Sequence, residues 1–243
     1  IKTIGVMHGG GYGEINNWNK EIFEKEFSDI YLHWGNGDLN IRQNKFSIIK
    51  NETKKIKRIY FVGTPNFGSV DFNGTYFDDS EHKKKSEQSK VRGRRKQIIS
   101  YLLKNYEVIF VQHPRIFIQQ KLAEEKLDVE IVRMKDIKLE NFYDSIFVLD
   151  YCFHSFFYKA VYQAIPFVMI YDKKWLEHFS TGYKRLLVFL ERKKYLYFTD
   201  QLNQFYDRIN YLFQKEEHTD VNMEIMKYID SKINYKESEK RAH

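Results

Sequence analysis

SIFVLDYCFHSFFYKAVYQAIPFVMIY, residues 145–171, is the stretch of sequence that decides the fold. Its two apolar runs, at residues 145–149 and 166–171, are nearly continuous in large hydrophobic residues, which is typical of strands that are buried on both faces. The segment between them reads as a helix over residues 155–163. The stretch therefore predicts two strands of a parallel sheet joined by a helix.

The same alternation of apolar runs and helical spacing extends to both sides of this stretch. Further strands are predicted at residues 2–7, 29–34, 56–63, 107–112 and 129–133, and helices at 17–27, 90–106, 116–127 and 200–235. Strands that alternate with helices indicate an α/β domain with a doubly wound parallel sheet, here followed by C-terminal helices. In such sheets, ligands bind outside the carboxyl ends of the strands, so the residues after each strand are the functional candidates.

The composition excludes several classes of protein. The 243 residues are 42% hydrophobic and 17% aromatic with only 3 prolines, so the chain is neither disordered nor collagen-like. Cys152 is the only cysteine, which excludes an intramolecular disulfide and fits a reducing compartment, so we expect a cytoplasmic protein. We expect no membrane span, because no apolar run of about 18 residues occurs. No signal peptide is visible at Ile1, and this start inside a strand suggests one domain of a longer protein.

The net charge of +7 is concentrated in one segment. Residues 83–96 contain a single acid, Glu87, and eight basic residues: Lys83, Lys84, Lys85, Lys90, Arg92, Arg94, Arg95 and Lys96. The segment has no aromatic residue for base stacking, so we expect no nucleic acid partner, although a nucleic-acid-binding module is the alternative class. We interpret the segment as a basic loop and helix start. It either attracts an anionic ligand, or contacts anionic lipid at the inner face of the cytoplasmic membrane, or is simply solvated.

A glycine-rich loop follows the first predicted strand. Its sequence, HGGGYG, comprises His8, Gly9, Gly10, Gly11, Tyr12 and Gly13. Glycine permits positive φ and close approach, so the N–H groups of such a loop can surround a phosphate. The loop is not a Walker motif, because no Gly-Lys-Ser/Thr follows, and it is not a GxGxxG fingerprint. A tight turn without a ligand is the alternative.

A histidine follows the strand predicted at residues 107–112. His113 is held by Pro114, which fixes the backbone at the strand end, so its imidazole can donate to a phosphate or a ribose hydroxyl. Arg115 can add a bidentate phosphate contact. Packing alone is an equally good explanation of His113.

A third polar strand end follows residues 145–149. It carries Asp150, His154 and Ser155, and the last two lie where the next helix begins. These side chains can cap the helix, or can bind a phosphate together with its free N–H groups. Three strand ends that each carry His or Ser favour a polyanionic ligand.

Other kinds of chemistry are not indicated. The histidines at the strand ends have no nucleophile elbow, and no HExxH or Asp-x-Asp metal motif occurs. The pair Asp78-Asp79 is better explained as two solvated acids than as a Mg²⁺ site. Cys152, among aromatic residues, is best explained as a packed thiol.

These motifs together resemble a known family. HGGGYG after an opening strand, SDIYLHWG at residues 28–35, His113-Pro114, and the block from Asp150 to Pro166 are similar to the C-terminal, nucleotide-binding half of bacterial GT-B glycosyltransferases. The nearest likeness is to transferases of O-antigen and other surface-polysaccharide gene clusters. The His-Pro and serine-bearing elements are also similar to those of CDP-glycerol glycerophosphotransferases and CMP-sugar transferases. The likeness covers roughly residues 1–175.

The resemblance implies a Rossmann-like, nucleotide-sugar-binding domain over residues 1–199 and a C-terminal helical extension over 200–243. It implies metal-independent transfer, without a cofactor, from a CMP-, UDP- or CDP-linked sugar to a glycan or lipid-linked acceptor. A non-catalytic interaction domain that binds a nucleotide is a further alternative. His113 would contact the donor's phosphate or ribose, Ser155 and the adjacent helix N-terminus its phosphates, and the glycine loop the face where two domains close. The acceptor-binding N-terminal domain of such enzymes is expected to be missing here, and His8 is the one candidate for a catalytic base.

Overall fold

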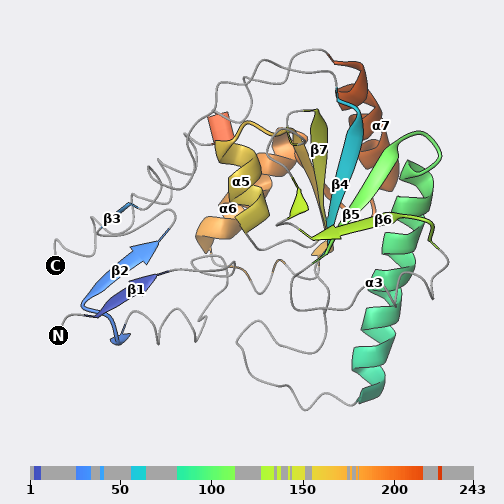
Figure 1. The fold of residues 1–243 in the computed structure, drawn as a ribbon. Coiled ribbons are helices and arrows are strands. Elements are labelled where there is room, and N and C mark those ends of the chain that lie inside the picture. The colour runs from blue at the N-terminus through green and yellow to red at the C-terminus, as the bar shows by residue number, and fades with distance from the viewer. Residues whose placement is uncertain are drawn as a thin grey trace.

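The computed structural model describes residues 3–6, 26–33, 39–40, 56–63, 81–112, 127–133, 136–137, 142, 144–150, 155–173, 176, 179, 181–215 and 224–225. Their strands are β1 (Ile4–Val6), β2 (Ile30–His33), β3 (Leu39–Asn40), β4 (Arg58–Gly63), β5 (Glu107–Gln112), β6 (Glu130–Arg133), β7 (Ser145–Asp150), β8 (Phe167–Tyr171) and β9 (Leu196–Phe198). Their helices are α3 (Glu81–Leu102), α5 (Ser155–Tyr162), α6 (Thr181–Arg192) and α7 (Leu202–Gln214), as Figure 1 shows.

The larger of the two sheets confirms the predicted fold class. It has six strands, all parallel, in the order β6-β5-β4-β7-β8-β9. Counted along the chain from β4, this is the order 3-2-1-4-5-6 of the doubly wound Rossmann fold. The chain moves outward from β4 to β6, returns to β7 on the other side of β4, and moves outward again to β9. The order therefore reverses between β4 and β7, which form the switch point of the sheet.

The sheet is covered on both faces because its strands alternate between two hydrophobic clusters. Tyr60 and Val62 of β4 point to the cluster that contains α5 and α6, whereas Ile59 and Phe61 point to the cluster that contains α3 and α7. Every residue of β7 is buried in the same alternating way. Crossovers between parallel strands are right-handed. Connections that lead from β4 toward β6 therefore cover one face of the sheet, and connections that lead from β7 toward β9 cover the opposite face.

The three-stranded sheet β1-β2-β3 is separate from the six-stranded one and is also parallel. Thr3, just before β1, is hydrogen-bonded to Asp29, just before β2. The backbone N–H of Thr3 donates to Asp29 Oδ2 at 2.7 Å, and its hydroxyl donates to the same oxygen at 3.0 Å. These hydrogen bonds lower the pKa of Asp29. The strands predicted at residues 2–7 and 29–34 are thus confirmed, although they do not join the large sheet. The division into domains at residue 199 stays a prediction.

Several predicted elements differ from the structure in their bounds. Helix α3 begins at Glu81, nine residues before the predicted start, because EHKKKSEQSK contains no apolar residue that could reveal a helical period. The predicted tail helix is α7, followed by an extended Lys215. Tyr211 of this helix is 50% exposed. The helix predicted at 116–127, and most of those at 17–27 and beyond 215, lie outside the described residues.

Three elements were not predicted: the two-residue strand β3, helix α6 and strand β9. Helix α6 buries Tyr183, Leu186, Leu187 and Leu190 at the spacing of one helix face, and β9 completes the edge of the large sheet. The pattern for α6 is present in the sequence, but β9 has only three residues, too few to show a period. Within the described part of the chain, no helix combines the length and the hydrophobicity needed to cross a membrane.

Candidate functional site

The carboxyl ends of β4 and β7 are the place where this strand order binds ligands. Gly63, the last residue of β4, is the register partner of Asp150, the last residue of β7. Both belong to the alternate set of positions that faces α3 and α7, since Phe61 and Val148 precede them by two residues. At the switch point, the carboxylate of Asp150 therefore lies next to a glycine, which has no side chain.

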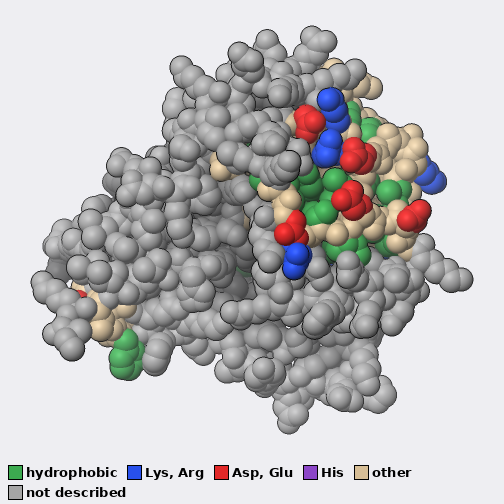
Figure 2. Space-filling model, viewed as in Figure 1, with side chains coloured by type: hydrophobic (Ala, Val, Ile, Leu, Met, Phe, Trp, Pro, Cys, Tyr) green, Lys and Arg blue, Asp and Glu red, His purple; other side chains and the backbone are tan. Residues whose placement is uncertain are grey.

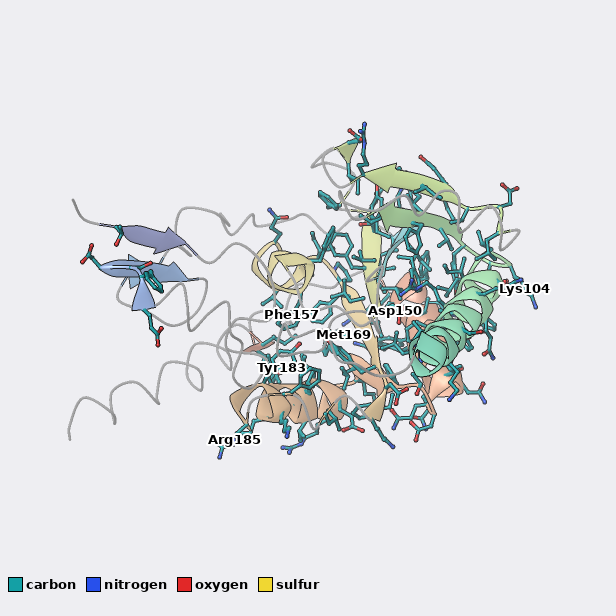
Figure 3. All side chains as sticks on the ribbon, turned by 90° about the horizontal axis from the view of Figure 1, so that it is seen from below. Lys104, Asp150, Phe157, Met169, Tyr183 and Arg185 are labelled. Carbon is teal, nitrogen blue, oxygen red and sulfur yellow. The ribbon has the colours of Figure 1, made fainter. Side chains whose placement is uncertain are left out.

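Arg95 of α3 is the partner of the Asp150 carboxylate. Its Nε donates to Asp150 Oδ2 at 2.7 Å, Asp150 is fully buried, and Arg95 is 8% exposed. Arg95 follows Val91 by four residues and precedes Ile98 by three, so it lies on the apolar face of the helix. Figure 3 shows Asp150 beside α3, in the interior of the molecule. The pair joins the helix to the switch point by a buried, charge-assisted hydrogen bond.

Gly63 leaves the space that Arg95 occupies. A Cβ atom at this position would lie 2.9 Å from Arg95 Cζ and 3.0 Å from its Nε. Since real Cβ contacts are not this short, any side chain here would displace the guanidinium from Asp150. The glycine at the end of β4 is thus required for close approach rather than for an unusual backbone conformation.

Arg94 extends the cluster to the next strand. Its guanidinium lies 3.9 Å from Asp150 Oδ1 and 4.0 Å from Asp172 Oδ2, and Asp172 directly follows β8. The side chains of Arg94 and Asp172 are 13% and 27% exposed, so this part of the cluster reaches the surface. We call Gly63, Arg94, Arg95, Asp150 and Asp172 the switch-point cluster.

The switch-point cluster contains two arginines and two aspartates, so its formal charges cancel. Arg95 and Asp150 are buried and hydrogen-bonded to each other, which suits them to fix the position of α3. The Arg94 side chain is 13% exposed, close to the 10% of Arg95, and its ion pairs with Asp150 and Asp172 are longer than a direct hydrogen bond. A guanidinium in this position can bind an anionic group such as a phosphate in a bidentate manner.

Most of the predicted site residues lie outside the described residues. These are His8, Gly9, Gly10, Gly11, Tyr12, Gly13, His113, Pro114, Arg115 and His154. Ser155 is described as the first residue of α5, without its side chain, and Asp150 is described in full. The structure therefore tests the roles of none of them, and they stay predictions.

The strand order nevertheless brings two of the predicted strand ends close to each other. His113 directly follows Gln112, the last residue of β5, and Ser155 begins α5 shortly after β7. Only β4 separates β5 from β7, so their ends are about 10 Å apart. This spacing is compatible with one ligand that contacts both strand ends.

Arg94, Arg95 and Asp172 were not predicted as site residues. The two arginines were assigned to a basic loop and helix start, whereas they lie well inside α3. One signal in the sequence could have identified Arg95, because it is a charged residue on the apolar face that Val91, Ile98 and Leu102 define. Such a residue needs a buried partner, but the sequence does not say which one.

The rest of the basic segment belongs to the same helix. Because α3 runs antiparallel to the strands it connects, and Arg95 is level with their carboxyl ends, the helix extends about 20 Å further toward its N-terminus. Lys90 and Lys96 are exposed. Figure 2 shows acidic and basic side chains intermixed over the described part of the face in view. Contact of the basic segment with anionic lipid stays a prediction.

No group of three His, Cys, Asp or Glu side chains in the described ranges is arranged to hold a metal ion. A comparison of the chain with protein-family models, with curated proteins and with solved structures found no match.

Proposed function

We propose that this chain is the donor-binding domain of a metal-independent glycosyltransferase, which binds a nucleotide-activated sugar and transfers the sugar to a surface-polysaccharide or other glycan acceptor. One observation carries the proposal. Arg94 of α3 lies at the carboxyl ends of the strands next to the switch point of a sheet of Rossmann order, 4.0 Å from the partly exposed Asp172. A nucleotide diphosphate is the kind of ligand that this location and this side chain favour.

Each part of the site has a role in this proposal. Arg94 binds the donor's phosphates, and the buried pair of Arg95 and Asp150 holds α3 so that Arg94 stays over the strand ends. When the bond between the sugar and the phosphate breaks, negative charge develops on the departing nucleotide, and a fixed guanidinium and the N–H groups at the start of α5 stabilise it. The proton of the acceptor hydroxyl passes to a base, for which His8 is the candidate.

Calorimetric titration with CMP, CDP, UDP and their sugar conjugates tests the proposal. We expect at least one of these nucleotides to bind. Arg94→Gln should lower the affinity for that nucleotide about tenfold or more, because a hydrogen bond between charged groups contributes roughly 1.5–3 kcal/mol. His113→Ala and Ser155→Ala should also lower the affinity for the same nucleotide. Arg185→Gln is the matched control, since Arg185 is an exposed arginine of α6 and lies well away from Asp150 (Figure 3).

Two results would contradict the proposal. One is that none of the nucleotides binds to the folded wild-type chain. The other is a nucleotide whose affinity is the same in wild type, Arg94→Gln and His113→Ala, because that nucleotide would be bound elsewhere.

A further inference from the structure

A second candidate site lies along the open edge of the six-stranded sheet. A groove of about 720 Å³ runs beside β9, the last strand of the sheet, between the end of α6 and one face of α7. Its volume is within the range of roughly 300–1,000 Å³ that is typical of small-ligand sites. None of the residues that line it belongs to the switch-point cluster.

Arg208 is one of three basic residues that line this groove, with Arg192 and Lys194. Its guanidinium lies 5.3 Å from the ring centre of Tyr195 and 5.1 Å from that of Tyr211, so two aromatic rings fix its position. Arg94 and Arg95 each lie near an aspartate, whereas no ion pair joins Arg208 to an acid within the described ranges. Its buried Nε also has no hydrogen-bond partner there. A fixed arginine without a carboxylate partner is suited to bind the anionic group of a ligand.

The remaining lining residues are suited to hydroxyl groups. Gln204 lies one turn before Arg208 on α7, Asp207 directly precedes Arg208, and Glu191 and Arg192 line the groove from the end of α6. This set contains both hydrogen-bond donors and acceptors, and a hydroxyl is a group that both donates and accepts.

Tyr211 supplies an aromatic surface. The ring lines the groove and is half exposed, which is unusual for a side chain of this size at the surface of a helix that buries its other face. The C–H face of a sugar ring packs against such an aromatic ring while its hydroxyls remain available for hydrogen bonds.

A peptide strand does not fit this edge. The outward N–H of Phe198 donates to Gln201 Oε1 at 2.9 Å, and the carbonyl of Phe198 accepts from the N–H of Gln201 at 2.8 Å. These contacts occupy groups of β9 that an added strand would need. The groove therefore favours a compact ligand over an extended chain.

We propose that this groove binds a sugar ring that carries an anionic group, either a carboxylate or a phosphate. The anionic group pairs with Arg208, the ring packs on Tyr211, and the hydroxyls bind Gln204 and Asp207. The inference stands apart from the proposed function, because it requires no nucleotide and uses no residue of the switch-point cluster.

The inference is tested by using ligand-observed NMR to measure the binding of three matched pyranoses to the full chain. The probes are glucuronic acid, glucose 6-phosphate and neutral glucose, which share one ring and differ in the anionic group. We expect one or both acidic probes to bind more tightly than glucose, and the better probe identifies whether the anion is a carboxylate or a phosphate. Arg208→Gln should lower the affinity for the acidic probe about tenfold or more and leave the affinity for glucose unchanged.

Two further variants make the test specific. Tyr211→Ala should weaken the binding of both acidic and neutral probes, because it removes the surface on which the sugar ring packs, and the acidic probes should lose more, because it also removes one of the two rings that hold Arg208. Arg185→Gln, which removes an exposed arginine of α6 outside the groove, should change nothing. If Arg208→Gln does not fold by circular dichroism, Arg208→Lys replaces it, with the expectation of a smaller loss because a lysine lacks the bidentate geometry.

The inference is wrong if no probe binds the folded wild type, if glucose binds as well as the acidic probes, or if Arg208→Gln binds them as well as Arg185→Gln does. A nucleotide that still binds Arg208→Gln but not Arg94→Gln would support the proposed function alone. The two proposals can therefore fail independently.

Discussion

Gly63 and Arg95 illustrate how one residue type can be required by a neighbour that lies far away in the sequence. We predict that Gly63→Ala destabilises the protein by about 1–3 kcal/mol, because its Cβ would displace a guanidinium that is buried and hydrogen-bonded to Asp150. Urea unfolding measures the change in the free energy of unfolding.

Gly93→Ala is the matched control, because a Cβ at that position of α3 meets no atom within 4 Å. An alanine in an exposed helix is more favourable than a glycine by roughly 0.5–1 kcal/mol, so this variant should be stabilised. Equal effects of the two substitutions would mean that Arg95 does not occupy the space over Gly63.

Asp150 and Asp200 take part in ion pairs of nearly equal length but opposite burial. Arg95 Nε lies 2.7 Å from Asp150, which is fully buried, and Lys173 Nζ lies 2.8 Å from Asp200, which is 61% exposed. We predict that Asp150→Asn destabilises the fold by on the order of 3 kcal/mol, because it leaves a buried guanidinium without its counter-charge. Urea unfolding again provides the measurement.

Asp200→Asn serves as its control and should have a far smaller effect, because solvent screens an exposed pair. If the two aspartate variants are equally stable, the Arg95–Asp150 pair does not anchor α3.

At the scale of the secondary-structure elements, α3 is held by one apolar stripe. Ile98 is fully buried against the sheet, whereas its neighbour Gln97 is exposed. We predict that Ile98→Ala lowers the free energy of unfolding by about 2–5 kcal/mol, and that Gln97→Ala changes it by less than about 0.5 kcal/mol. Thermal and urea unfolding of the two variants should agree on this contrast; similar values for both would place the buried face of α3 elsewhere.

The elements also show how far a sequence pattern can be followed. The strands β5 and β7 were predicted to within one residue, because their apolar runs are continuous and end in polar residues. Half of α3 was missed because its N-terminal residues are polar all round. Tyr211 is half exposed and lines the groove with Arg208, a position that the apolar pattern of α7 does not reveal.

The packing of the whole molecule predicts a sensitivity to alkaline pH. Burial raises the pKa of Tyr195 to about 12, and it also raises the pKa values of Tyr60, Tyr106, Tyr197 and Tyr206. A tyrosine of the unfolded chain ionises near 10, so the folded state keeps Tyr195 neutral to a higher pH. The stability that this provides is fully present below pH 10 and is lost as the pH rises from 10 to about 12.

We therefore predict that the free energy of unfolding falls over this pH interval, and that Tyr195 accounts for up to about 3 kcal/mol of the fall. Tyr195→Phe, which cannot ionise, should show a smaller decline than wild type when urea unfolding is followed as a function of pH. Parallel declines in the two proteins would mean that other groups cause the loss.

The sequence by itself determined five of the six strands of the large sheet, β4 to β8, and their alternation with helices, because both follow from local hydrophobic patterns. It also indicated that function lies at the strand ends. Only the tertiary structure decided the order of the strands, and with it the switch point between β4 and β7. The reason is that strand order depends on contacts between segments far apart in the chain. Arg95 and Asp150, which are 55 residues apart, become neighbours only when α3 packs across Gly63.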